Sequence, residues 1–196
     1  MGLFLQTAII PDCSEATLRK AVAAVAEKYS CELESPDFDE SSEFHILDLM
    51  PDDCKYQSAQ NGISILFNED CMGYESLAGA LSEELGKAVL LLYIYDGDYW
   101  GYFLYDKGLE IDQFVPMPDY FNAVSKDEKQ QVKGNADIIA KYFHVDKASI
   151  EKYIVFWTDK MMNDYSTKAY EDDEFGQCVD WQMADFMRKL GYPYEW

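Results

Sequence analysis

The stretch that decides the fold is YDGDYWGYFLYDKG, residues 95–108, which continues the apolar run AVLLLYIY of residues 88–95. An Asp-Gly pair between two apolar runs is a strong signal for a β-hairpin, because its two-residue turn needs positive φ. Lys107-Gly108 marks a second turn by the same logic. The sequence therefore predicts three consecutive antiparallel strands.

A two-residue turn at Asp96-Gly97 also determines which side chains share a face of the sheet, and only a three-residue loop would change the assignment. Both faces are apolar, which predicts cover on both sides. The first face carries Leu90, Leu92, Ile94, Tyr99, Gly101 and Phe103, and the second carries Leu91, Tyr93, Tyr95, Trp100, Tyr102 and Leu104.

The residues before the hairpin contain both strand and helix signals. Strands are expected at residues 3–10, 44–50, 63–67 and 88–95, and helices at residues 14–25 and 74–86. The resulting order, β-α-β-β-α-β, is that of a split βαβ, ferredoxin-like unit. We therefore expect an α+β fold with an antiparallel sheet of about six strands, in which the hairpin extends the ferredoxin-like start.

The pattern changes after Phe114, where Pro116 and Pro118 interrupt regular structure. Helical periodicity follows, and we expect helices near residues 136–143, 150–157 and 178–190. The domain organisation predicted is an α+β sheet domain at 1–115 and a C-terminal helical region at 116–196. This region is expected to pack on the other face of the sheet, within a single compact unit.

The charge of the chain limits its partners. With 16 basic and 37 acidic residues, the formal net charge is −21. Binding to nucleic acid requires Lys and Arg to neutralise phosphates, so we expect no nucleic acid partner and no anionic membrane surface. The longest apolar run, residues 88–95, is far shorter than the roughly 20 residues that span a bilayer. In a cytoplasmic protein, such a charge then serves either ordinary solubility or association with a basic protein, and the oligomeric state stays open.

Sequence motifs for catalysis are missing. The five cysteines form no CxxC pair, which favours reduced thiols in a cytoplasmic setting. No glycine-rich phosphate loop, dinucleotide fingerprint or GxSxG elbow occurs, and residues 37–48 fail the glycine and glutamate requirements of a calcium loop. We therefore predict no catalytic residue, no metal and no cofactor, and favour a binding protein over an enzyme.

Two groups of residues are candidate binding sites. The aromatic group is either core beneath the C-terminal helices or an open binding patch, since Tyr and Trp dominate interaction hot spots. The acidic group is either a solvated loop or a site for a basic partner. The aromatic candidates are Tyr93, Tyr95, Trp100 and Tyr102, and the acidic candidates are Glu171, Asp172, Asp173 and Glu174.

One segment resembles a known kind of protein. Its matching residues are Asp98, Trp100, Tyr102, Leu104, Tyr105, Gly108, Asp112, Phe114, Pro118, Tyr120 and Phe121. Their spacing resembles segments of small, acidic, uncharacterised bacterial proteins, some of which are similar to immunity proteins of toxin systems. The resemblance covers residues 98–121 and implies a cytosolic binding protein that neutralises a partner through an acidic surface. It transfers no site residue.

Three functional hypotheses follow. The first is a non-enzymatic protein-binding module, with an immunity-type inhibitor of a basic partner as its finer form. The alternative is a small-molecule-binding protein or enzyme, with an aromatic pocket between residues 88–115 and the C-terminal helices. The third is a structural subunit that self-associates through the outer hairpin strand.

Overall fold

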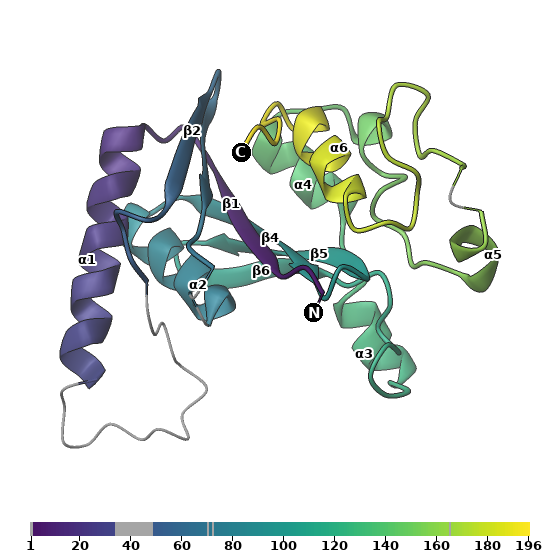
Figure 1. The fold of residues 1–196 in the computed structure, drawn as a ribbon, viewed down its shortest axis with the longest axis horizontal. Coiled ribbons are helices and arrows are strands. Elements are labelled where there is room, and N and C mark those ends of the chain that lie inside the picture. The colour runs from purple at the N-terminus through teal and green to yellow at the C-terminus, as the bar shows by residue number, and fades with distance from the viewer. Residues whose placement is uncertain (1, 34–48, 70, 72, 165) are drawn as a thin grey trace. The chain divides into compact units, whose positions relative to one another are not determined.

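The computed structural model describes residues 2–33, 49–69, 71, 73–164 and 166–196 (Figure 1). The predicted strand at residues 44–50 lies outside these residues except for its last two positions, which are not in a strand. The strands are β1 (Leu5–Pro11), β2 (Lys55–Ala59), β3 (Gly62–Leu66), β4 (Ala88–Tyr95), β5 (Tyr99–Asp106) and β6 (Leu109–Phe114). The helices are α1 (Glu15–Leu33), α2 (Tyr74–Leu85), α3 (Lys126–Gln131), α4 (Ala136–Phe143), α5 (Asp159–Met162) and α6 (Gln182–Lys189), with a 3₁₀ turn η1 at Lys147–Ser149.

The six strands form one open antiparallel sheet in the order β2-β3-β1-β4-β5-β6. Strand β3 is paired on both sides, so that Ser64 lies opposite Ile9 of β1 and opposite Gln57 of β2. The first four strands have the ferredoxin-like order, and β5 and β6 extend the sheet beyond β4. The predicted α+β fold is confirmed.

The chain forms two compact units by its internal contacts. One contains Gln6–Leu91 and Leu104–Ile111, and the other contains Leu92–Phe103 and Asp112–Glu195 with the residues up to Leu5. Strands β4, β5 and β6 therefore contribute residues to both units. This grouping follows spatial contacts, and the expected ranges 1–115 and 116–196 stay a prediction.

In the unit of Gln6–Leu91, helices α1 and α2 pack against each other (Figure 1). Leu18 of α1 and Leu81 of α2 are fully buried, as the helical periodicity predicts. The left-handed conformation of Gly86 ends α2, and its N–H donates to the Glu83 carbonyl. Strand β2 was not predicted, because its sequence KYQSA carries a weak apolar signal at the sheet edge.

The predicted assignment of the hairpin side chains to two faces is wrong, because the loop is one residue longer than predicted. The connection is the three-residue loop Asp96–Asp98, in which Asp96 and Gly97 have positive φ. The extra residue shifts the register, so that Tyr95 stacks on Tyr99 with ring centroids 5.5 Å apart. Tyr93 stacks on Phe103 in the same way, at 5.6 Å. Tyr93 and Tyr95 thus lie with Tyr99 and Phe103, on the opposite face from Trp100 and Tyr102.

The C-terminal helices follow the sequence signals in part. Helix α4 buries Ile139 and Phe143 as predicted, and α6 lies within the expected range 178–190. The helix expected at residues 150–157 does not form, because the η1 turn ends at Ser149 and is followed by turns and bends up to residue 155. Ile150, Ile154 and Trp157 of this segment are nevertheless buried, whereas Val155 is exposed.

Candidate functional site

Five aromatic rings from three segments meet in the unit that contains Leu92–Phe103, and three of them are exposed while that of Tyr99 is buried. We call this group, Phe4, Tyr95, Tyr99, Tyr120 and Phe121, the aromatic surface cluster. Phe4 and Phe121 meet Tyr95 edge-on at 5.2 and 5.3 Å. The exposed fractions of Phe121 and Phe4 are 64% and 51%. Exposed large rings gathered at one place are typical of interaction surfaces.

Local backbone contacts hold the cluster together. The N–H of Gly97 in the hairpin loop donates to the Leu3 carbonyl at 2.8 Å, which places Phe4 beside the loop. A turn follows Pro116, in which the N–H of Tyr120 donates to the Met117 carbonyl at 3.0 Å. The Tyr120 hydroxyl donates to Asp98, which connects this turn to the hairpin loop.

A cavity of about 360 Å³ adjoins the cluster. Its walls include Asp98 and Asp180, the rings of Tyr120 and Trp157, and Met162. A second cavity of about 400 Å³ shares Tyr120, Trp157 and Met162 with the first. Tyr120 therefore belongs to both the exposed cluster and the cavity walls.

The cavity is acidic. The hydrogen bond to Asp98 raises the pKa of Tyr120 to about 12. Burial, and then the charge of Asp98, raises the pKa of Asp180 above its ordinary value, while the N–H of Trp181 donates to Asp180 at 2.9 Å. Within the described part of the chain, neither Asp98 nor Asp180 forms an ion pair with a lysine or arginine. The cavity thus presents two carboxylates without a counter-charge from these residues.

Asp180→Asn is expected to stabilise the protein near pH 7. Because the pKa of Asp180 is raised in the folded state, the folded protein binds this proton more tightly than the unfolded chain does, and stability falls as pH rises through the folded pKa. An amide oxygen can still accept from Trp181 but carries no charge. Urea unfolding should therefore show a gain at about pH 7 that disappears at about pH 3. A gain in stability that is equal at both pH values would contradict the raised pKa of Asp180.

The predicted aromatic candidates are mostly core. Trp100 and Tyr102 are fully buried, and both contact Phe186 of α6, with ring centroids 5.2 and 6.2 Å away. The Tyr102 hydroxyl donates to Asp112 at 2.7 Å, and burial raises the pKa of Tyr102 well above its ordinary value. Tyr93 is also buried, so that Tyr95 alone of the four belongs to the aromatic surface cluster.

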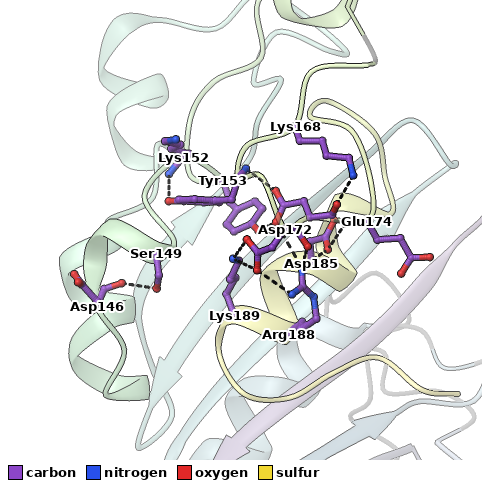
Figure 2. A network of polar contacts seen from close by, with 12 residues as sticks. Asp146, Ser149, Lys152, Tyr153, Lys168, Asp172, Glu174, Asp185, Arg188 and Lys189 are labelled. Atoms are coloured by element: carbon purple, nitrogen blue, oxygen red, sulfur yellow. Dashed lines mark hydrogen bonds and ion pairs between the residues drawn. The ribbon is translucent and has the colours of Figure 1, made fainter.

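The predicted acidic candidates belong mainly to an internal polar network (Figure 2). Asp173 is buried and accepts hydrogen bonds from the Tyr153 hydroxyl and the Tyr170 N–H. Asp172 forms ion pairs with Arg188 and Lys189 on α6. Glu171 and Glu174 are exposed, so the run Glu171–Glu174 is not a uniform acidic surface.

The same network fixes the segment around Tyr170. The Tyr170 hydroxyl accepts from the Lys152 N–H at 3.1 Å, and the ammonium groups of Lys152 and Lys189 lie 4.8 and 5.0 Å from its ring centroid. These contacts are intramolecular and stabilise the loop against α6. The network therefore has a structural role, which the sequence did not reveal.

Comparison with protein family models, curated proteins and solved structures found no match. Within the described residues, no three His, Cys, Asp or Glu side chains are placed to hold a metal ion together. Over the same part of the chain, every helix is too short or too polar to cross a membrane.

The residues that form the candidate site were mostly not predicted from the sequence. Phe4, Asp180 and Trp157 had no local signal that could have selected them. Asp98, Tyr120 and Phe121 lie in the segment 98–121 on which the sequence resemblance was based, but that resemblance gave them no role. A Tyr-Phe pair in a proline-bounded loop, where rings have few neighbours to pack against, is the one signal available.

Proposed function

We propose that this chain is a non-enzymatic protein-binding module that recognises a basic partner through the aromatic surface cluster. The observation that carries the proposal is the exposure of Phe121 and Phe4 beside a cavity with two uncompensated carboxylates. Burying such rings against a partner is favourable, because it removes apolar surface from water. A pair of carboxylates at the same place selects a partner of opposite charge.

The charge of the whole chain supports this choice of partner. A net charge of −21 steers basic proteins toward the molecule and repels nucleic acid and anionic membranes. Association should therefore weaken as salt concentration rises, because salt screens charges separated by more than about 10 Å at 0.1 M.

The finer form of the proposal is a cytoplasmic, immunity-type inhibitor of a basic toxin. The segment 98–121 resembles small, acidic bacterial proteins, some of which are similar to immunity proteins, and it also supplies Asp98, Tyr120 and Phe121 of the candidate site. Genomic context provides a separate test. A neighbouring gene for a large secreted toxin would support this form, and co-expression should then protect cells from that toxin.

The alternative of an aromatic small-molecule pocket has less support. The rings that would line it, Tyr93, Trp100 and Tyr102, are buried and packed on other side chains. None of them is among the residues that line the cavity of about 360 Å³.

Phe121→Ser is expected to weaken partner binding at least about tenfold, because it removes an exposed ring from the centre of the proposed interface. The partner would be captured from source cytoplasm at low salt, identified by mass spectrometry and purified. Its dissociation constant would then be measured by calorimetry against wild-type and variant protein. The variant itself should fold normally, since substitutions at exposed positions change stability by about 0.5 kcal/mol or less.

Leu109→Ser is the matched control. Leu109 is 71% exposed at the start of β6 and lies outside the aromatic surface cluster. We expect its replacement to leave the dissociation constant unchanged. A partner that binds the Phe121→Ser protein as tightly as wild type, or the failure to find any partner that is sensitive to this change, would overturn the proposal.

A further inference from the structure

The cavity beside the aromatic surface cluster is lined by three kinds of side chain: carboxylates, aromatic rings and methionines. Two carboxylates come from Asp98 in the hairpin loop and from Asp180 just before α6. Two aromatic rings come from Tyr120 and Trp157. Methionine side chains complete the apolar lining, and thioether groups adapt to long, flexible ligands. The volume of about 360 Å³ lies at the small end of the roughly 300–1,000 Å³ typical of ligand sites.

We infer that this cavity receives an arginine side chain of the basic partner, an inference that rests on the proposed function. A guanidinium group is planar, so it can stack on an aromatic ring while its edge donates two hydrogen bonds to a carboxylate. Its three-carbon stem is apolar and suits the methionine lining. A lysine ammonium satisfies the charge but neither the stacking nor the paired hydrogen bonds.

The charges around the cavity favour a cationic occupant. Asp98 accepts from the Tyr120 hydroxyl and Asp180 from the Trp181 N–H, but neither forms an ion pair with a described lysine or arginine. In the neighbouring cavity, by contrast, Lys129 is already paired with Asp119. An arriving guanidinium would therefore meet two carboxylates with no competing cation among the residues that line this cavity.

The occupant is a side chain of a protein and not a small cation, because the cavity adjoins the aromatic surface cluster. Tyr120 lines the cavity and also contacts Phe121 and Tyr95 of the aromatic surface cluster. A protein that covers the exposed Phe121 ring thus lies directly beside the cavity and can insert one of its own side chains. A small cation would fill the cavity and leave those rings exposed.

The test uses blocked single amino acids as probes. N-acetylarginine amide, N-acetyllysine amide and N-acetylcitrulline amide would be titrated into the protein, and the methyl resonances of Met117 and Met162 and the indole N–H of Trp157 would be followed by NMR. We expect the arginine probe to bind with a dissociation constant on the order of 1 mM. The lysine probe should bind more weakly, and citrulline, which has the same shape without the charge, should cause no saturable shift.

Asp180→Asn is expected to weaken the arginine probe at least about fivefold, because it removes one charged hydrogen-bond acceptor. Glu151→Gln is the matched control, since it removes the same charge from an exposed side chain that does not line the cavity. Its effect on the arginine probe should be less than twofold.

Each contrary outcome has a defined meaning. Equal binding of citrulline and arginine, or an unchanged dissociation constant in Asp180→Asn, overturns the arginine site. If the purified partner still depends on Phe121 but not on Asp180, the proposed function stands and this inference fails. Spermidine provides the test for a small-molecule cation, because micromolar binding of spermidine in this cavity would overturn the assignment to a protein side chain.

Discussion

Replacing Asp185 with alanine is expected to lower the free energy of unfolding by about 3–5 kcal/mol. The Asp185 side chain on α6 is only 2% exposed. Its carboxylate accepts from the backbone N–H groups of Glu174 and Phe175 at 2.9 and 2.8 Å, and from Arg188 at 2.9 Å. Alanine leaves all three donors without this acceptor, and an unsatisfied buried donor is destabilising by about 1–3 kcal/mol.

The effect should be large because Asp185 connects the loop that contains Glu174 to the helix behind it (Figure 2). The neighbouring carboxylate of Asp173 is buried as well, and it lies 3.7 Å from Arg188. Loss of Asp185 therefore disturbs a second buried acid through their common arginine. Hydrogen exchange at residues 166–176 should increase in the variant, which would locate the damage in this loop.

Asp172 offers a control that shares Arg188 with Asp185 but is exposed and also pairs with Lys189. Its carboxylate contacts the same Arg188 at 3.2 Å but is 62% exposed. Because exposed ion pairs contribute little to stability, Asp172→Ala should shift the urea midpoint only slightly. Asp185→Asn, which keeps one acceptor oxygen, should fall between the two and ensures a folded variant for measurement. Equal midpoint shifts for Asp185→Ala and Asp172→Ala would contradict the expectation that the buried carboxylate contributes more to stability than the exposed one.

Local signals in the sequence were sufficient for most elements of the fold. Gly86, with its left-handed conformation, ends α2 where expected, and the Lys107-Gly108 turn has positive φ at both residues. These positions were predictable because the backbone requirement is local and few residues satisfy it. Strand β2 was missed because a polar edge strand is specified by pairing with β3, which the sequence of β2 alone does not contain.

The candidate site was less predictable, for a physical reason. Both DYWGYF at residues 98–103 and PDYF at residues 118–121 are rich in aromatic residues. Whether each ring is buried depends on residues far away in the sequence. Trp100 is buried by Phe114 and Phe186, whereas Phe121 remains largely exposed. The prediction of the hairpin faces was wrong for a similar reason, because Asp96, Gly97 and Asp98 allow either a two-residue or a three-residue connection. One residue in that loop decides which rings share a face.

Gly101→Ala is expected to lower the free energy of unfolding by about 3 kcal/mol, because the added methyl group has no room. A Cβ atom at Gly101 would lie 2.4 Å from the Tyr93 hydroxyl oxygen and 2.6 Å from the Phe114 carbonyl oxygen. The second contact is with backbone, which cannot rotate away as a side chain can. A glycine inside a strand often marks such a close approach.

Two further variants distinguish the steric clash at Gly101 from the general effect of replacing a glycine with alanine. Gly79→Ala in α2 places a Cβ atom 3.4 Å from the Tyr105 ring, an ordinary contact, and should stabilise the helix by about 0.5–1 kcal/mol. The double variant Tyr93→Phe/Gly101→Ala removes the nearest oxygen but leaves the Phe114 carbonyl and the ring carbon Cζ, both 2.6 Å away. It should therefore remain destabilised in urea unfolding. Full recovery in the double variant would mean that the Tyr93 hydroxyl is the sole obstacle and that the backbone of β6 is free to move.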